Sequence, residues 1–243
     1  MRTELLRDIA EKCKIMDTEP KRRVIIAIEG PVCAGKSTIV ERLNQEGLGT
    51  ILEYSEYVAH ANQDFPKFPP TDEKVAKRSF EFFLNLEHKR YQNMSDLMQN
   101  WIAIDRSIFT LLAFEIGATK ITGINIFDWA IARLKDENNL IIPSHIYYLD
   151  VPTATSRDRA ERNSIPIPDF LLSNEFNQGF HNFFVWLRQT IPDYVTFIPA
   201  SEESNEVLSL LHKELGSREV NQLSSTVQAP NPSMVQFFDT LSP

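Results

Sequence analysis

The segment GPVCAGKST, residues 30–38, places glycine, lysine and hydroxyl side chains in the order G-x-x-x-x-G-K-[ST], which is typical of a phosphate-binding loop. Glycine lets the backbone wrap closely around phosphates, and the following helix presents its positive N-terminal end. Lys36 is placed to reach the β- and γ-phosphates of a nucleoside triphosphate, and the Ser37 hydroxyl to ligate Mg²⁺. The predicted ATP-binding residues are Gly30, Pro31, Val32, Cys33, Ala34, Gly35, Lys36, Ser37 and Thr38.

A carboxylate and a guanidinium end the apolar run WIAID at Asp105 and Arg106. Asp105 could hold Mg²⁺ directly or through water, together with Ser37, or polarise the hydroxyl of a phosphoryl acceptor. Arg106 could grip an anionic substrate. The alternative is a buried acid that caps the next helix. The phosphate loop upstream favours the catalytic interpretation.

Three arginines crowd the segment SRDRAERN, at Arg157, Arg159 and Arg162. Arginines here could close over a transferring phosphoryl group, neutralise its charge and exclude water. Asp158 and Glu161 are interleaved with them, so a solvated helix face with local ion pairs remains the alternative.

These motifs need a scaffold of strands and helices in alternation. Apolar runs predict strands at 23–29, 49–55, 101–105, 145–151 and 194–200, and helical patterns occupy 73–99, 126–137, much of 168–191, and 203–215. Because strands that alternate with helices of this length pair in parallel through right-handed crossovers, the sequence predicts an α/β fold.

Length and composition favour one domain with two extensions. The chain has 243 residues, with 42% hydrophobic and 24% charged residues and a net charge of −8. We expect an N-terminal helical extension at 1–22, a phosphate-loop domain at 23–216 and a flexible tail at 217–243, in which MVQFF could dock on the domain or on a partner. The acidic balance disfavours nucleic acid and anionic membranes as partners. The absence of signal-like or membrane-spanning runs predicts a cytoplasmic protein.

Three motifs, IEGPVCAGKST, IDRSIFTLLAFE and RDRAER, occur in an order that resembles the P-loop kinases of nucleosides and nucleotides, the group of thymidylate kinase and the deoxynucleoside kinases. Glu29 and Gly30 open the loop as in that group, and Asp105-Arg106 matches its Asp/Glu-Arg pair. DRSI followed by Ala113-Phe114 looks particularly like the deoxynucleoside kinases. The similarity spans roughly residues 23 to 200.

The resemblance implies a P-loop NTPase three-layer sandwich with a central five-stranded parallel sheet and an arginine-bearing lid. It also implies ATP as phosphoryl donor with Mg²⁺. Arg106 would contact the acceptor, and Arg157, Arg159 and Arg162 would form the lid. Members are often dimers, so a homodimer is one expected assembly.

The sequence departs from this group after the second predicted strand. Deoxynucleoside kinases carry Glu-Pro there, with the glutamate as base for a sugar hydroxyl, and thymidylate kinases carry an arginine-containing loop. This chain has ILEYSEYV, with neither proline nor arginine. Glu53 is the better-placed candidate base, Asp105 remaining the other, and the missing arginine favours a neutral hydroxyl acceptor.

The helix FEFFLNLEHKRYQ lies where such kinases line the acceptor pocket. Phe82 or Phe83 could stack on a base, and Asn85 or Arg90 could hydrogen-bond its edge, although phenylalanines at this spacing also suit a core. The resemblance implies that the acceptor is a nucleoside or a nucleoside monophosphate. Another metabolite or antibiotic hydroxyl, or a nucleotide-switched binding module, is the alternative.

Overall fold

The computed structural model describes residues 23–58, 65–200, 205 and 207–213. The predicted extension 1–22 and tail 217–243 lie outside the described residues. The elements are β1 (Val24–Glu29), α2 (Lys36–Gln45), β2 (Gly49–Ile51), α3 (Ser55–Val58), α4 (Glu73–Ser95), β3 (Trp101–Asp105), α5 (Ile108–Thr122), α6 (Phe127–Lys135), β4 (His145–Asp150), α7 (Thr153–Arg162), the 3₁₀ helix η1 (Asp169–Leu172), α8 (Asn174–Thr190) and β5 (Val195–Pro199).

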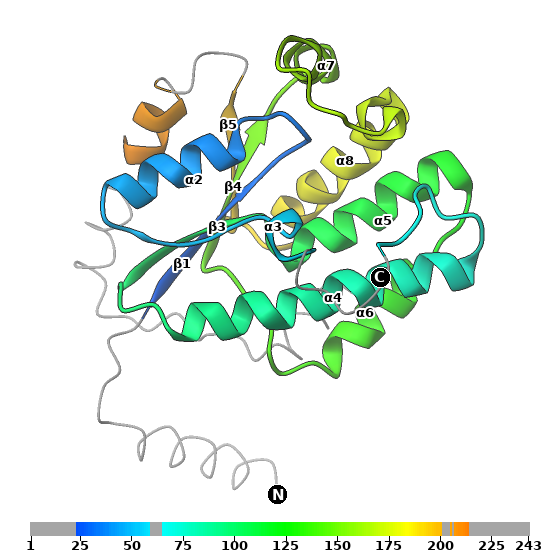
Figure 1. Ribbon diagram of the computed structural model, residues 1–243, viewed down its shortest axis with the longest axis horizontal. Helices are drawn as coiled ribbons and strands as arrows, with labels where there is room; N and C mark the ends of the chain where they lie inside the picture. Colours follow the sequence, from blue (N-terminus) through cyan, green and yellow to red (C-terminus); the bar gives the residue numbers. More distant parts are fainter. Residues whose placement is uncertain (1–22, 59–64, 201–204, 206, 214–243) are drawn as a thin grey trace, which may run out of the picture.

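A single parallel sheet of five strands, in the order β2-β3-β1-β4-β5, forms the centre of the described structure (Figure 1). β1 pairs with β3 from Val24 opposite Trp101 to Ile28 opposite Asp105, and with β4 on its other side. Strands β3 and β2 lie on one side of β1, and β4 and β5 lie on the other. Because the connections run in opposite directions on the two sides of β1, a crevice is expected at the carboxyl ends of the central strands. The phosphate loop and Asp105 both leave the sheet at those ends.

Helices cover both faces of the sheet and produce three layers (Figure 1). α2 and the helical residues 207–213 lie on one face, where Ile26 and Ile28 of β1 point. α4, α5, α6 and α8 cover the other face, where Ala27 points. Because neighbouring residues of a strand face opposite sides, one apolar strand can supply both cores. The predicted three-layer α/β sandwich is confirmed.

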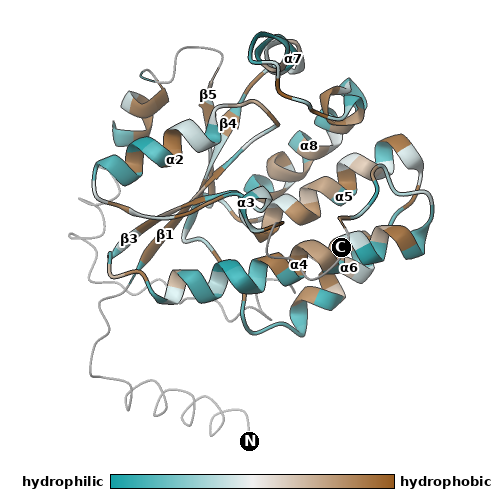
Figure 2. Ribbon diagram, in the orientation of Figure 1, coloured by the Kyte–Doolittle hydropathy of each residue, from teal (hydrophilic) through white to brown (hydrophobic). Residues whose placement is uncertain are grey.

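The central helix α5 is apolar around most of its circumference, whereas α7 is largely hydrophilic (Figure 2). α5 packs against α8 at Gly117 and Gly179, where a Cβ on Gly179 would lie 2.9 Å from the Gly117 Cα. A helix buried on most sides needs such small residues, since they let a neighbouring helix approach closely. The two helices therefore form a tightly packed wall.

Two predicted elements differ from the structure. The strand expected over 49–55 ends at Ile51, because the Leu52 carbonyl accepts from Arg90 and the Glu53 and Tyr54 carbonyls accept from N–H groups of the short helix α3. The helix expected over much of 168–191 is divided into η1 and α8. Ser173 separates them, because its hydroxyl accepts a hydrogen bond from the Phe176 N–H and caps α8.

Candidate active site

The phosphate loop joins β1 to α2 through backbone conformations that favour glycine. Gly30 has φ 142° and Gly35 has φ 93°, and a Cβ on Gly30 would lie 2.7 Å from the Leu149 carbonyl oxygen. Cys33 also adopts a left-handed conformation, with φ 56°. The glycines at the first and sixth positions of the motif are thus required by the path of the chain.

A cavity of about 980 Å³ opens beside this loop and the start of α2. Its lining includes Gly35, Lys36, Ser37 and Thr38. Lys36 is buried and its Nζ donates to the Pro31 carbonyl oxygen at 2.8 Å. Burial, with the nearby Arg106 charge, lowers the pKa of Lys36 to about 8. A polyphosphate bound beside Lys36 would add negative charge and favour the protonated form of the lysine.

Asp105 and Ser37 meet between the end of β3 and the start of α2. The Ser37 hydroxyl donates to Asp105 Oδ2 at 2.6 Å. Asp105 is buried, and its Oδ1 has no hydrogen-bond partner among the described residues. An unpaired carboxylate oxygen beside a hydroxyl, next to a phosphate loop, is a donor set that suits Mg²⁺. The two residues predicted to hold the metal are therefore brought together.

Arg106 and Glu53 form an ion pair beside the phosphate loop. Arg106 Nε donates to Glu53 Oε1 at 2.5 Å, and its NH1 group donates to the Gly30 carbonyl oxygen at 3.3 Å. Burial opposes the charge of Glu53, but Arg106 and Lys36 outweigh it and lower the carboxyl pKa to about 2. Glu53 is thus ionised at neutral pH. Arg106 has φ 64°, a backbone conformation that costs roughly 1–3 kcal/mol in a non-glycine residue and concentrates at functional sites.

Glu29 holds the start of α5 against the end of β1. Its fully buried carboxylate accepts from the Ser107 N–H at 2.7 Å, the Ser107 hydroxyl at 2.6 Å and the Thr110 hydroxyl at 2.5 Å. Burial raises the pKa of Glu29, while these hydrogen bonds favour the charged form. The bonds fix the backbone on the C-terminal side of Arg106, so they stabilise its left-handed conformation.

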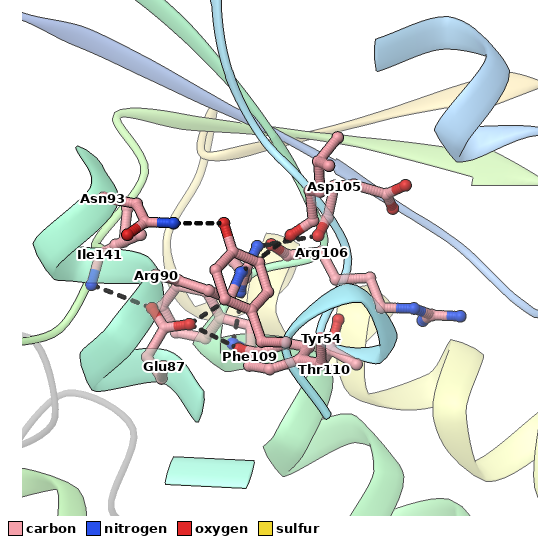
Figure 3. A network of polar contacts seen from close by, with 12 residues as sticks. Tyr54, Glu87, Arg90, Asn93, Asp105, Arg106, Phe109, Thr110 and Ile141 are labelled. Carbon is pink, nitrogen blue, oxygen red and sulfur yellow. Dashed lines mark hydrogen bonds and ion pairs between the residues drawn. The ribbon is translucent and has the colours of Figure 1, made fainter. Parts of the chain in front are cut away.

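Arg90 lies inside the protein rather than on a cavity wall (Figure 3). Its guanidinium donates to Glu87 Oε2 at 2.7 Å and stacks over the Tyr54 ring at 4.2 Å. It also donates to the backbone carbonyl oxygens of Leu52, Asp105 and Arg106. Arg90 therefore connects α4 to the ends of β2 and β3 and positions the backbone on which Glu53, Asp105 and Arg106 stand.

The three arginines of α7 have different surroundings. Arg159 lines the 980 Å³ cavity and donates to the carbonyl oxygens of Cys33, Ala34 and Ala200. Arg162 lines the same cavity, is exposed and donates to the Asp158 backbone carbonyl. Arg157 instead donates to the Leu172 carbonyl oxygen of η1 and does not line this cavity. Two of the three predicted lid arginines thus face the phosphate-binding region.

A second cavity, of about 470 Å³, lies between α4, α5, η1 and α8. Phe83 lines it and packs edge-on against Tyr54 with ring centroids 6.0 Å apart. Asn85 is exposed on the opposite side of α4 and lines a different depression, with Phe82. Of the predicted acceptor residues on α4, the structure therefore places Phe83 alone on this wall. The further aromatic residues lining the cavity are Phe65, Phe68, Phe80, Phe114, Phe170, Phe176 and Phe180.

The two cavities share part of their walls. Val32, Glu53 and Arg106 line both, whereas Asp105 lines neither. The ion pair of Glu53 and Arg106 thus stands where a ligand in the aromatic cavity would meet a nucleotide on the phosphate loop.

Sequence reasoning missed several polar residues of the second cavity, among them Thr110 and Glu115. Both belong to the apolar helix α5, and Glu115 is almost completely buried. A single acid within the run SIFTLLAFEIG is the signal that could have identified Glu115, because buried carboxyl groups without partners are rare.

Solved structures of deoxyadenosine kinase from M. mycoides resemble this chain. The complex with the products dCMP and a flexible dCDP has a TM-score of 0.58 at 18% identity, and the complex with dATP has a TM-score of 0.59 at 17% identity. The complex with dCTP has a TM-score of 0.51 at 18% identity. Each comparison covers 80% of this chain and 100% of the other.

The chain has the fold of the P-loop deoxynucleoside kinases. This confirms the fold that the three sequence motifs predict. No protein-family model matches the chain, and no curated protein matches it. Among the residues that the structure describes, no helix is both long and apolar enough to cross a membrane.

Proposed function

We propose that this chain is a kinase that transfers the γ-phosphoryl group of ATP to a hydroxyl of a nucleoside or nucleoside monophosphate. The observation that carries this proposal is the shared wall of the two cavities. A phosphate-binding cavity and an aromatic cavity meet at the ion pair of Glu53 and Arg106. The solved deoxyadenosine kinases with bound dATP and dCTP, which share the fold, support a nucleoside as acceptor.

On the donor side, the loop 30–38 would hold the ATP phosphates with its backbone N–H groups and with Lys36. Ser37 and Asp105 would hold Mg²⁺, which when bound neutralises negative charge on the phosphates. Arg159 and Arg162 lie on the wall of the same cavity and would add positive charge around the transferring group. Arg157 faces η1 and would act only in support of α7.

On the acceptor side, Glu53 would accept a hydrogen bond from the attacking hydroxyl. Because its low pKa makes it a weak base, it would take the proton only once that oxygen has bonded to phosphorus and become acidic, as the bond to ADP breaks. Its contact with both cavities favours Glu53 over Asp105, which is bonded to Ser37, for this role. Arg106 would orient Glu53 and stabilise charge on the transferring group. Since Arg106 is the single cation among the described residues lining the aromatic cavity, and Glu53 already pairs with it, a neutral nucleoside is favoured over its monophosphate.

A panel of acceptors tests the proposal. γ-labelled ATP and Mg²⁺ are incubated with the full chain and with nucleosides, nucleoside monophosphates and unrelated alcohols, and labelled products are separated. Transfer to nucleosides is expected, and it should fall by about 10²–10⁴-fold in Glu53→Gln, which keeps the shape but removes the base. Glu56→Gln, three residues away on the exposed face of α3, is the matched control and should retain activity.

Transfer to another alcohol with none to nucleosides would establish the alternative acceptor class. ATP-dependent binding of a protein without any small acceptor would contradict the kinase assignment. Retention of transfer by Lys36→Ala, in a variant that still folds, would contradict the proposed donor site.

A further inference from the structure

Among the described residues that line the aromatic cavity, Glu115 is the buried polar side chain that has no protein partner and no role in the proposed mechanism. Glu115 is 5% exposed, and among the described residues no hydrogen bond or ion pair reaches its carboxyl oxygens. The other buried polar groups of this wall are satisfied, in the pairs Glu53–Arg106, Tyr54–Glu87, Ser79–Val75 and Thr110–Glu29. A carboxyl group on a largely buried side chain needs a hydrogen-bond partner, and the cavity that Glu115 lines is where a ligand could supply one.

The position of Glu115 fits the far end of an elongated acceptor. α5 begins beside Arg106, at the junction with the phosphate cavity, and Glu115 lies seven residues further along. At the rise of an α-helix this is roughly 10 Å along the axis. A ligand whose hydroxyl meets Glu53 would therefore extend past the rings of Phe83 and Phe114 toward Glu115, with a flat ring in the aromatic part of the cavity.

The surroundings also set the form of the carboxyl group. Burial raises the pKa of Glu115 to about 8, so the group is mostly a neutral acid at pH 7. The other titratable groups on this cavity wall are Glu53, Tyr54 and Arg106. A neutral carboxyl presents one O–H donor and one carbonyl acceptor side by side. Its complement is a ligand edge with one acceptor and one donor.

We propose that Glu115 recognises the heterocycle of the acceptor, and that this heterocycle carries an amino group beside a ring nitrogen, as adenine and cytosine do. The inference rests on the proposed function and names its substrate class. The Glu115 O–H would donate to the ring nitrogen, and its carbonyl oxygen would accept from the amino group. The ring nitrogen is more basic than the carbonyl oxygens of thymine or uracil, so it makes the stronger hydrogen bond to an acid.

The test combines binding and turnover for wild type, Glu115→Gln and Glu115→Leu. Binding of deoxyadenosine, of the purine deoxynucleoside that lacks the 6-amino group, and of thymidine is measured by calorimetry with a non-hydrolysable ATP analogue present. kcat/KM is measured for the same nucleosides. Wild type should favour deoxyadenosine over both others by roughly 10- to 100-fold, the range expected for one or two well-placed hydrogen bonds.

Glu115→Leu should lose that preference while its affinity for the ATP analogue changes less than about 3-fold. Glu115→Gln should retain it, because an amide also places an N–H donor beside a carbonyl acceptor. Equal binding of all three nucleosides by wild type, or an equal loss for all three in Glu115→Leu, would overturn the assignment. Selective binding without turnover would support recognition by Glu115 but overturn the proposed reaction, and turnover without selectivity would do the reverse.

Discussion

Replacing Arg90 by methionine should strongly destabilise the protein, because this side chain holds three backbone carbonyls and one carboxylate inside the core. The carbonyls of Leu52, Asp105 and Arg106 would lose their donor, at about 1 kcal/mol each. Glu87 would keep its bonds from the Tyr54 hydroxyl and the Ile141 N–H but lose its buried counter-charge. Breaking a buried pair on one side costs about 3–5 kcal/mol, a large part of the total stability of a typical domain.

Urea unfolding followed by tryptophan fluorescence measures this loss. With an m-value of about 2 kcal/mol per M, a loss of about 4 kcal/mol lowers the unfolding midpoint by about 2 M. Arg78→Met is the matched control, since Arg78 is an exposed arginine on the same helix, and its midpoint should move by less than about 0.3 M. If Arg90→Met unfolds at the same urea concentration as the control, Arg90 does not hold the ends of β2 and β3 in place.

Three other predictions concern the loop, the helix pair and the buried acid. Gly30→Ala should weaken ATP binding at least about 10-fold in titrations with the full chain, because the added Cβ would meet the Leu149 carbonyl; unchanged affinity would show that the loop does not need this conformation. Gly179→Ala should lower stability by about 1–3 kcal/mol and raise the KM of the acceptor more than that of ATP, since α5 and α8 wall the aromatic cavity; equal changes in both KM values would contradict this. The folded-state pKa of Glu115 is raised from the ordinary 4.5 to about 8, so its contribution to stability is present at low pH and is lost as the pH rises from about 5 to 8. The unfolding free energy of wild type should therefore fall over that pH range relative to that of Glu115→Gln. Parallel curves of unfolding free energy against pH would refute the raised pKa.

The donor half of the site could be predicted from the sequence because its residues are linked by strand ends. The phosphate loop follows β1 and Asp105 ends β3, and neighbouring parallel strands must present both at one edge of the sheet. The contact of Ser37 with Asp105 follows from that arrangement. The order of motifs and strands along the sequence was therefore sufficient to predict which donor-site residues lie together.

The acceptor half depends on helix orientation and on contacts between distant segments. Phe83 and Asn85 are two residues apart on α4, so they face nearly opposite sides of the helix. Helical geometry alone therefore excludes that both line one pocket. Arg90 shares the side of Phe83 but lies near the sheet, where its partners come from β2 and β3. The aromatic residues around 65–68 and 170–180 reach the cavity only through long-range packing, which no local pattern reveals.

A bisubstrate analogue, in which adenosine and deoxyadenosine are joined through a polyphosphate, tests the central claim that two cavities meet at Glu53 and Arg106. Calorimetry with the full chain should give one analogue bound per chain, and the bound analogue should displace both ATP and a nucleoside. Displacement of ATP alone, with undiminished nucleoside binding, would contradict the account.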